Sequence, residues 1–387
     1  MALNFLKRNF ISPLLELIHD SRAVGFLLLL CTIVSLFISN TSFGSSYILF
    51  WQTELHASAY LPHSLLHWIN DGLMAVFFFQ VGMEIKRELL IGELASVKKS
   101  IMPVAGAVGG MVVPALIFIA FNLSTEFQHG WGVPMATDIA FSLGVASLLG
   151  KRVPVSLKIF LMALAIIDDL GAIIAIAVFY TETFSMMYLF AGLGIFTTLL
   201  LWNYFKLPFG FWNFLLGILL WFCFYNSGVH ATIAGVLFAF TIPLKRLESI
   251  EQALHNYVNF LIIPLFALAN TAILIPDGFV NDLSSTLSLG IMLGLLIGKP
   301  LGIVGFTFIL VQLKLGTLAK GIGWKHMTGL GLLAAIGFTM SIFISMLAFK
   351  SSFTQDMSKM AVMIASLTAI ILAYAWFKIF TKEKASK

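Results

Sequence analysis

Charged residues are scarce in this chain. Asp, Glu, Lys and Arg together make up 11% of its 387 residues, whereas an ordinary globular domain carries about 25%. Hydrophobic residues make up 59% of the sequence, without a long polar domain, charge block or low-complexity segment between them. This composition excludes a soluble enzyme, a disordered chain, a collagen and a nucleic-acid-binding protein. It indicates one integral membrane domain over residues 1–387.

The sequence also lacks a cysteine framework. Cys31 and Cys223 both lie inside apolar stretches, without the clustered spacing of a metal site or a disulfide scaffold. No small-residue cleavage site follows the first apolar run near 23–38, which Lys7 and Arg8 precede. We therefore interpret that run as part of a retained spanning helix. The sequence also carries no motif for a cofactor, and we expect none to be bound.

Apolar runs bounded by charges or turn residues predict an all-α polytopic membrane protein, because about 20 apolar residues cross a bilayer as one helix. The runs near 209–223 and 229–243 are short, but Asn226 and Gly228 mark a turn between them. We therefore expect about twelve transmembrane helices. They lie near 14–38, 65–90, 101–122, 131–149, 155–180, 186–205, 209–223, 229–243, 254–276, 287–311, 327–349 and 358–381.

Basic residues alternate between the two sides of this topology. All 23 Lys and Arg residues fall on one side except Lys299, Lys350 and Lys359. Because short cytoplasmic loops collect Lys and Arg, we expect this side and both chain termini to face the cytoplasm. The net charge of +5 then reflects the basic cytoplasmic loops and does not indicate an anionic partner. We expect the protein to be surrounded by membrane lipid.

The longest outer connection runs over residues 41–63. Its segment SSYILFWQTEL is rich in β-branched and aromatic residues, which permit a short β-hairpin on the membrane surface. An interfacial aromatic anchor around Tyr47 and Trp51 explains the same segment equally well. The sequence leaves both interpretations open.

Ionisable residues at membrane depth are the candidate functional residues, because a charge at the bilayer centre costs roughly 2.5–3.5 kcal/mol. They are Asp138 in MATDIAFSLG, Asp168 and Asp169 in LAIIDDLGAI, Lys299 in LLIGKPLG, and the cluster that begins at Glu84 in VGMEIKREL.

Asp168 and Asp169 lie near the middle of their predicted helix, far in sequence from any basic residue. Mutual repulsion and desolvation both favour proton uptake by such a pair. Carboxylate oxygens are also hard ligands that suit a small hard cation. Protons and a cation would therefore compete for one site, although a buried pair neutralised by hydrogen bonds is the simpler alternative.

Two predicted helices carry helix-weakening residues. Gly130, Gly132, Pro134 and Thr137 precede Asp138, and Gly329, Gly331 and Gly337 precede Phe338 in the second helix. Interrupted helices in corresponding positions of two halves point to a transporter site. Asp138 is then expected to balance positive half-helix ends and Lys299 negative ones. A plain helix cap remains the alternative for Asp138.

Lys299 is followed by Pro300, which bends the helix. An unpaired ammonium at this depth would lose its proton, so we expect a carboxylate partner, either Asp168 or Asp169. The pair could be purely structural, or it could carry a proton or act as a gate.

Several further residues lie at the predicted cytoplasmic end of the second helix and in ESIEQALHNYV. Glu84 and Glu88 are one turn apart on one helix face and could attract cations at the mouth of a cavity. Glu251 and His255 are candidates for a response to pH. A solvated helix end with local ion pairs explains the first cluster equally well.

Six motifs together resemble the NhaA-type sodium/proton antiporters: MATDIAF, AIIDDLGA, LIGKPLG, VGMEIKREL, GVHATIAG and IGFTMSIF. The resemblance extends over nearly the whole chain, in the expected order. It implies twelve helices with two inverted three-helix repeats, in which the fourth and eleventh helices are broken and cross near the midplane. It also implies a multi-pass protein of the bacterial inner membrane.

The resemblance implies roles for individual residues. Asp168 and Asp169 would form the cation and proton site, with Asp169 the more direct sodium ligand and Asp168 the partner of Lys299. Thr137 and Asp138 match the unwound stretch and complete the cation site.

The resemblance also implies a pH-response region and a dimer contact through residues 41–63. The pH-response region would comprise Glu84, Arg87, Glu88, Glu251 and His255. One position departs from the family pattern: Gln252 stands where a histidine is expected directly after the position of Glu251.

We therefore expect a secondary transporter rather than an enzyme: an electrogenic, pH-regulated antiporter that exports sodium and lithium in exchange for protons. An uncoupled cation channel could use the same carboxylates. Leu170, Gly171 and Ala172 follow Asp169, so the second aspartate that a prenyl transferase needs is missing. The Gly-x-Gly-Asp turn of an intramembrane aspartyl protease is also missing, and a retinal protein bound at Lys299 would have fewer spans.

Overall fold

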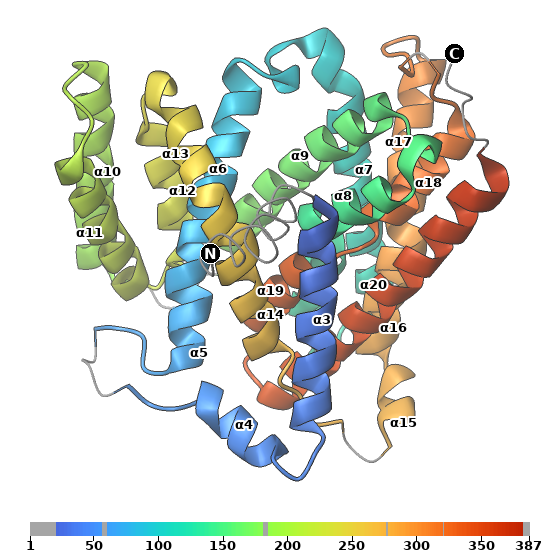
Figure 1. The fold of residues 1–387 in the computed structure, drawn as a ribbon, viewed down its shortest axis with the longest axis horizontal. Helices are drawn as coiled ribbons and strands as arrows, with labels where there is room; N and C mark the ends of the chain where they lie inside the picture. Colours follow the sequence, from blue (N-terminus) through green and yellow to red (C-terminus); the bar gives the residue numbers. More distant parts are fainter. Residues whose placement is uncertain (1–20, 56–59, 181–184, 276–277, 320, 382–387) are drawn as a thin grey trace, which may run out of the picture.

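A computed structural model describes residues 21–55, 60–180, 185–275, 278–319 and 321–381 as a bundle of helices (Figure 1). The first half contains α3 (Ser21–Ser39), α4 (Gly44–Trp51), α5 (Leu65–His67), α6 (Met74–Leu90), α7 (Val97–Asn122), the 3₁₀ segment η4 (Gln128–Met135), α8 (Ile139–Leu148) and α9 (Val155–Phe179). The second half contains α10 (Met186–Tyr204), α11 (Phe211–Ser227), α12 (Thr232–Thr241), α13 (Leu244–Tyr257), α14 (Ile263–Asn270), α15 (Phe279–Leu283), α16 (Thr286–Leu293), α17 (Lys299–Gln312), α18 (Trp324–Ala334), α19 (Phe338–Ala348) and α20 (Ser352–Phe380).

Seven of the described helical segments are long and apolar enough to cross a membrane, or eight if the bent pair α18 and α19 counts as one span. Short π-helical turns join α5 to α6, α13 to α14 and α16 to α17. The connections 91–96, 149–154 and 205–210, with residues 313–319 and 321–323, lie at one end of the bundle, which we call the basic end, and α4 and α15 lie at the opposite end (Figure 1). The fold is thus that of a polytopic membrane protein.

The two expected interruptions are confirmed. The 3₁₀ segment η4 ends at Met135, residues 136–138 are not helical, and α8 begins at Ile139. The helices α18 and α19 are bent by 49° at a break between Ala334 and Phe338. Glycine weakens the helical hydrogen-bond ladder at both places, and Pro134 weakens it further at the first. The two breaks contact each other, because the amide of Asp138 donates to the carbonyl of Ile336 at 2.7 Å.

The interpretation of residues 41–63 as a β-hairpin is wrong. Gly44–Trp51 forms the helix α4, and the β pairing in the described part of this connection is a single bridge between Glu54 and Ser64. The rings of Tyr47 and Trp51 meet edge to face with centroids 5.9 Å apart. These residues are spaced i,i+4, so helix formation brings them together on one face. Residues 56–59 lie outside the described part.

The helix expected from residue 254 begins ten residues earlier, at Leu244. The hydropathy pattern missed this first part because LKRLESIEQALHNY is polar on most of its surface. Leu247 and Glu251 are the buried side chains of α13, so one narrow face packs while the charged face remains exposed. This helix places Glu251 and His255 one turn apart.

Two glycines allow α7 and α17 to touch through their backbones. A Cβ atom on Gly109 would lie 2.2 Å from the carbonyl oxygen of Gly302, and one on Gly302 would lie 2.0 Å from that of Gly109. Small residues at such crossings let membrane helices approach closely. The contact places the start of α17, with Lys299, deep in the bundle.

Lys86 has a structural role that its place in a basic cluster does not indicate. It is 7% exposed, and its Nζ donates to the carbonyls of Phe240 at 2.7 Å and Ile242 at 2.6 Å. These carbonyls lie at the end of α12, where a cation also opposes the negative end of the helix dipole. Lys86 therefore fastens α6 to α12.

Candidate functional site

Asp138 stands between two half-helices. Its Oδ1 accepts the amide of Phe141 at 3.0 Å, in the first turn of α8. Its Oδ2 accepts the amide of Thr339 at 3.0 Å and also the hydroxyl of Thr339, in the first turn of α19. The carboxylate thus satisfies donors at two positive helix ends. The expectation that Asp138 balances half-helix ends is confirmed, and the same geometry makes it a helix cap.

Lys299, the first residue of α17, contacts the first interrupted helix and is fully buried. Its Nζ is 3.0 Å from Oδ2 of Asp168 and also donates to the carbonyl of Met135, the last residue of η4. Of the two expected carboxylate partners, Asp168 is therefore the one that forms the ion pair. The contact with Met135 also confirms that Lys299 balances a negative half-helix end.

Asp168 is held by two side chains, Lys299 and Thr137. Besides Lys299 on α17, the hydroxyl of Thr137 lies 2.7 Å from its Oδ2. The same hydroxyl is 3.1 Å from the carbonyl of Ala334, at the end of α18. The second oxygen of Asp168, Oδ1, is buried and has no hydrogen-bond partner among the described residues. One oxygen is therefore fixed while the other remains unsatisfied.

Asp169 faces a cavity of about 300 Å³. The side chain is 1% exposed, and its Oδ1 has no hydrogen-bond partner among the described residues. Neighbouring residues on a helix point about 100° apart, which explains why Asp169 lines this cavity whereas Asp168 is directed to Lys299. Asp138 and Thr339 also line the cavity near Asp169.

The cavity continues from Asp169 to the polar ends of α6 and α13. There it is lined by Gln80, Glu84, Arg87, Glu251, His255 and Asn259. Nη1 of Arg87 is 2.7 Å from Oε1 of Glu251, and Nε2 of Gln80 is 3.4 Å from Oε1 of Glu84. The structure thus brings Asp169 and four of the five predicted pH-response residues to one cavity.

Glu88 is the exception among these five. It is 6% exposed and does not belong to the cavity lining. Its Oε1 is 3.5 Å from Nη2 of Arg87, and its Oε2 accepts the amide of Glu93 at 2.9 Å. Glu88 thus orders the helix end and contacts the cavity residue Arg87.

Three polar residues of the cavity were not among the predicted site residues. Gln80 precedes Glu84 by one helical turn, and Asn259 follows His255 by one turn, with its Nδ2 3.2 Å from the imidazole. The i,i+4 spacing was the signal for both. Thr339 belonged to the predicted weak stretch, but its contact with Asp138 depends on tertiary structure.

Gln252 lies away from the cavity. Its Nε2 is 3.3 Å from Oε1 of Glu248, an exposed contact within α13. The position at which the chain departs from the family pattern is therefore exposed to the surroundings, one residue along the helix from the cavity residue Glu251.

Comparison with known proteins agrees with this geometry. The family model described as Na⁺/H⁺ antiporter 1 matches residues 16–377. The Na⁺/H⁺ antiporter NhaA of Cytophaga hutchinsonii is 45% identical over 376 residues, which cover 95% of this chain and 96% of the relative. NhaA 2 of Clostridium beijerinckii is 44% identical over 394 residues, with 98% of each chain covered.

A third relative, the Na⁺/H⁺ antiporter NhaA of Dechloromonas aromatica, is 48% identical over 374 residues, which cover 94% of this chain and 95% of the relative. These comparisons and the apolar helices support sodium/proton antiport by a multi-pass membrane protein. The chain therefore belongs to the Na⁺/H⁺ antiporter 1 family and is similar to its NhaA members.

Proposed function

We propose that this protein exports Na⁺ and Li⁺ in exchange for protons, by alternating access to a site at Asp168 and Asp169. Asp169 carries this proposal, because its buried Oδ1 lacks a hydrogen-bond partner among the described residues while its side chain lines a polar cavity. A buried carboxylate without a donor is costly until it binds a proton or a cation. The two therefore compete for the same place.

The cation ligands that we propose are Asp169, Asp168, Thr137 and Asp138. Asp168 and Asp169 each offer an oxygen without a partner among the described residues. The hydroxyl oxygen of Thr137 keeps acceptor capacity after it donates its proton, and Asp138 adds negative charge at the cavity wall. In this conformation the described residues do not bring three or more His, Cys, Asp or Glu side chains together around one metal-ion position. We therefore propose that the three aspartates move closer together when the cation binds.

We propose a coupling of two protons to one Na⁺, which is the ratio that the family resemblance implies. We assign one proton to Asp169 and a second to the Asp168–Lys299 pair, in which either partner can change its protonation state. Exchange of two protons for one Na⁺ moves one net charge in each cycle. The membrane potential then contributes about 2.3 kcal/mol per 100 mV to export.

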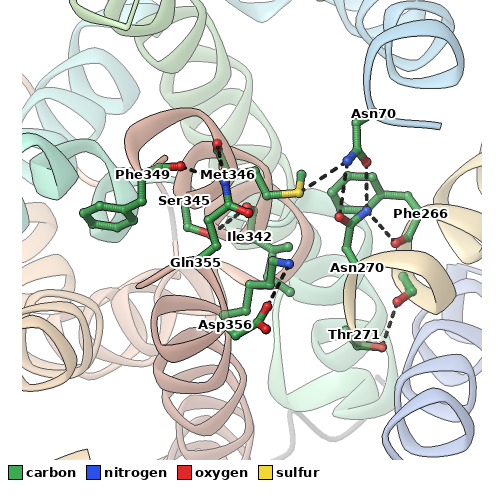
Figure 2. Close-up of polar contacts among 12 residues, drawn as sticks. Asn70, Phe266, Asn270, Thr271, Ile342, Ser345, Met346, Phe349, Gln355 and Asp356 are labelled. Atoms are coloured by element: carbon green, nitrogen blue, oxygen red, sulfur yellow. Dashed lines mark hydrogen bonds and ion pairs between the residues drawn. The ribbon is translucent and has the colours of Figure 1, made fainter. Parts of the chain in front are cut away.

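Alternating access is supported by an asymmetry between the two ends of the bundle. The cavity opens from Asp169 toward Arg87 and Glu251. On the opposite side, Asn70 and Asn270 form a reciprocal amide pair, with Nδ2 of Asn270 2.9 Å from Oδ1 of Asn70 (Figure 2). Nδ2 of Asn70 also lies 3.5 Å from the sulfur of Met346 on α19. We propose that this conformation faces the cytoplasm and that the contact from Asn70 to Met346 opens when the site faces outward.

Near the contact between Asn70 and Met346, Gln355 stabilises the turn between α19 and α20. Its Nε2 donates to the carbonyls of Met346 at 3.1 Å and Phe349 at 2.7 Å (Figure 2). The half-helix α19 begins at the site and ends at this turn, so a movement of α19 would reach both. We infer that α19 transmits the change of access between Thr339 and Met346.

Regulation by pH is proposed for the polar end of the cavity. Glu84, Arg87, Glu251 and His255 line it, and Glu88 contacts Arg87. Protonation of an acidic member or of His255 would change the charge that a cation meets on entry. We propose that these five residues set the pH range of activity without binding the transported ion.

The finer architecture also belongs to this proposal. We propose twelve membrane crossings with two inverted three-helix repeats, in the bacterial inner membrane, with both termini in the cytoplasm. Residues 41–63 would join two copies of the chain. Exposed side chains of this connection support the contact, since Phe43 is 72% exposed and Leu49 is 62% exposed.

The test is proton movement in liposomes after a sodium pulse, with Asp169→Asn and a potassium pulse as comparisons. Asp282→Asn is a matched control, because Asp282 lies on α15 at the opposite end of the bundle (Figure 1). We expect Na⁺-dependent proton movement in the parent and in Asp282→Asn, and none in Asp169→Asn. Sodium flux without proton movement in the parent would instead establish an uncoupled channel.

A further inference from the structure

A second pocket, of about 390 Å³, lies apart from the ion site at the basic end of the bundle. Its walls come from the connection between α8 and α9, the start of α18 and the end of α20. The residues that define it are Lys151, Arg152, Trp324, Lys325, His326 and Phe380. Sodium/proton exchange uses none of them.

This pocket concentrates positive charge. Lys151, Arg152 and Lys325 contribute cationic side chains, and the described residues that line it include no Asp or Glu. The eleven-residue helix α18 also begins here, after Gly323, and adds the positive end of its dipole. An anion is therefore the ligand whose charge fits the pocket.

Hydrogen bonds also fix the walls of this pocket relative to one another. Nη1 of Arg152 donates to the carbonyl of Lys378 at 2.8 Å and lies 3.4 Å from that of Thr381. These contacts fix the guanidinium against the end of α20. The indole of Trp376 donates to the carbonyl of Lys325 at 2.8 Å, which joins the first turn of α18 to the same end of α20.

Apolar surface next to the pocket distinguishes a lipid from a free anion. Phe380 lines the pocket and is 45% exposed, and its neighbour Ile379 is 71% exposed. Both lie in the last turn of α20, which is long and apolar enough to span the membrane. Acyl chains can lie along this surface while a phosphate enters the charged pocket. Basic pockets between helices at the cytoplasmic side bind anionic headgroups.

We propose that this pocket binds the phosphodiester headgroup of an anionic phospholipid. The bound lipid bridges the α8–α9 connection and the start of α18. The helices α8 and α18 also contact each other near the ion site. Ser142 on α8 contacts the carbonyl of Leu333 near the end of α18 at 2.8 Å. Lipid binding therefore stabilises the arrangement of the two interrupted helices.

The experiment measures thermal unfolding of delipidated full-length protein in detergent, during titration with phosphatidylglycerol or phosphatidylcholine. Native mass spectrometry counts the bound lipids in the same samples. We expect saturable stabilisation by phosphatidylglycerol only. Lys151→Gln/Lys325→Gln should weaken it about tenfold or more, since each basic residue near a charged headgroup contributes to binding.

Two further variants separate the site from general charge. Lys98→Gln/Lys245→Gln removes two exposed lysines elsewhere at the basic end and should keep the parent response. Lys151→Arg/Lys325→Arg keeps both positive charges and should keep the parent response to phosphatidylglycerol. Such a result would show that loss of charge, and not a change of side chain at these positions, weakens the response of the Gln variant. An unchanged response in Lys151→Gln/Lys325→Gln overturns the proposal. Equal stabilisation by inorganic phosphate at the same concentration overturns the assignment to lipid.

Discussion

Lys299 and Asp168 form an ion pair inside the bundle, with 3.0 Å between Nζ and Oδ2 and both side chains fully buried. The pair joins α17 to α9, and through Met135 and Thr137 it also contacts the first interrupted helix. The pair thus connects the interrupted helices to Asp168, which is the neighbour of Asp169 on α9. Predictions for stability and for transport both follow from it.

Lys299→Gln should destabilise the protein, because it leaves a buried carboxylate without its counter-charge. Loss of one partner of a buried pair costs roughly 3–5 kcal/mol. The double variant Lys299→Gln/Asp168→Asn should recover part of this loss, since neither charge then remains. Thermal unfolding of the parent, both single variants and the double variant measures the coupling, and strictly additive losses would show that the two side chains do not interact.

Gly302→Ala should separate α7 from α17. The added methyl group would lie 2.0 Å from the carbonyl oxygen of Gly109, and overpacking of this kind costs typically 1–3 kcal/mol. Gly305→Ala, one turn later on the same helix, meets nothing within 4 Å and should be neutral or slightly stabilising. Equal melting temperatures for the two variants would contradict the crossing.

Asp138→Asn should weaken both half-helix ends at once. Asparagine keeps one acceptor oxygen but loses the charge that faces the first turns of α8 and α19. We expect a loss of about 1 kcal/mol in stability and a higher KM for Na⁺, because the negative charge at the cavity wall disappears. Sodium-dependent exchange in liposomes measures KM, and an unchanged KM would remove Asp138 from the cation site.

Sodium export should slow as the cytoplasmic pH falls. Protonated carboxylates do not bind Na⁺, so each unit of acidification should raise the apparent KM for Na⁺ up to about tenfold while one proton competes. The maximal rate at saturating Na⁺ should change less. Kinetics at several pH values test this, and sodium uptake as fast near pH 5 as near pH 8.5 would exclude competition.

Arg87→Gln should alter the pH profile more than the stability. The Arg87–Glu251 pair is partly exposed, and pairs of this kind contribute about 0–1 kcal/mol to stability. The substitution removes a positive charge from the cavity and should raise the proton affinity of Glu251, which moves the active range to higher pH. Lys99→Gln, which breaks the exposed pair with Glu93, is the control and should leave the profile unchanged.

The sequence by itself determined the membrane class, the positions of two helix interruptions and the residues that carry charge at membrane depth. Their signals are local: apolar runs of sufficient length, glycine and proline inside two helices, and the cost of Asp168, Asp169 and Lys299 in an apolar environment. Family resemblance depended on the same short motifs. A local signal fails where two tendencies compete, as in residues 41–63, where aromatic residues at helical spacing formed α4 rather than a hairpin.

Only the tertiary structure decided which carboxylate meets Lys299 and which faces the cavity. Asp168 and Asp169 are adjacent in sequence, so the choice depends on the rotation of α9 relative to α17, which helix packing sets. The junction of Asp138 with Thr339 joins residues that are 201 positions apart. Contacts of this kind arise from helix packing, and no local pattern in the sequence specifies them.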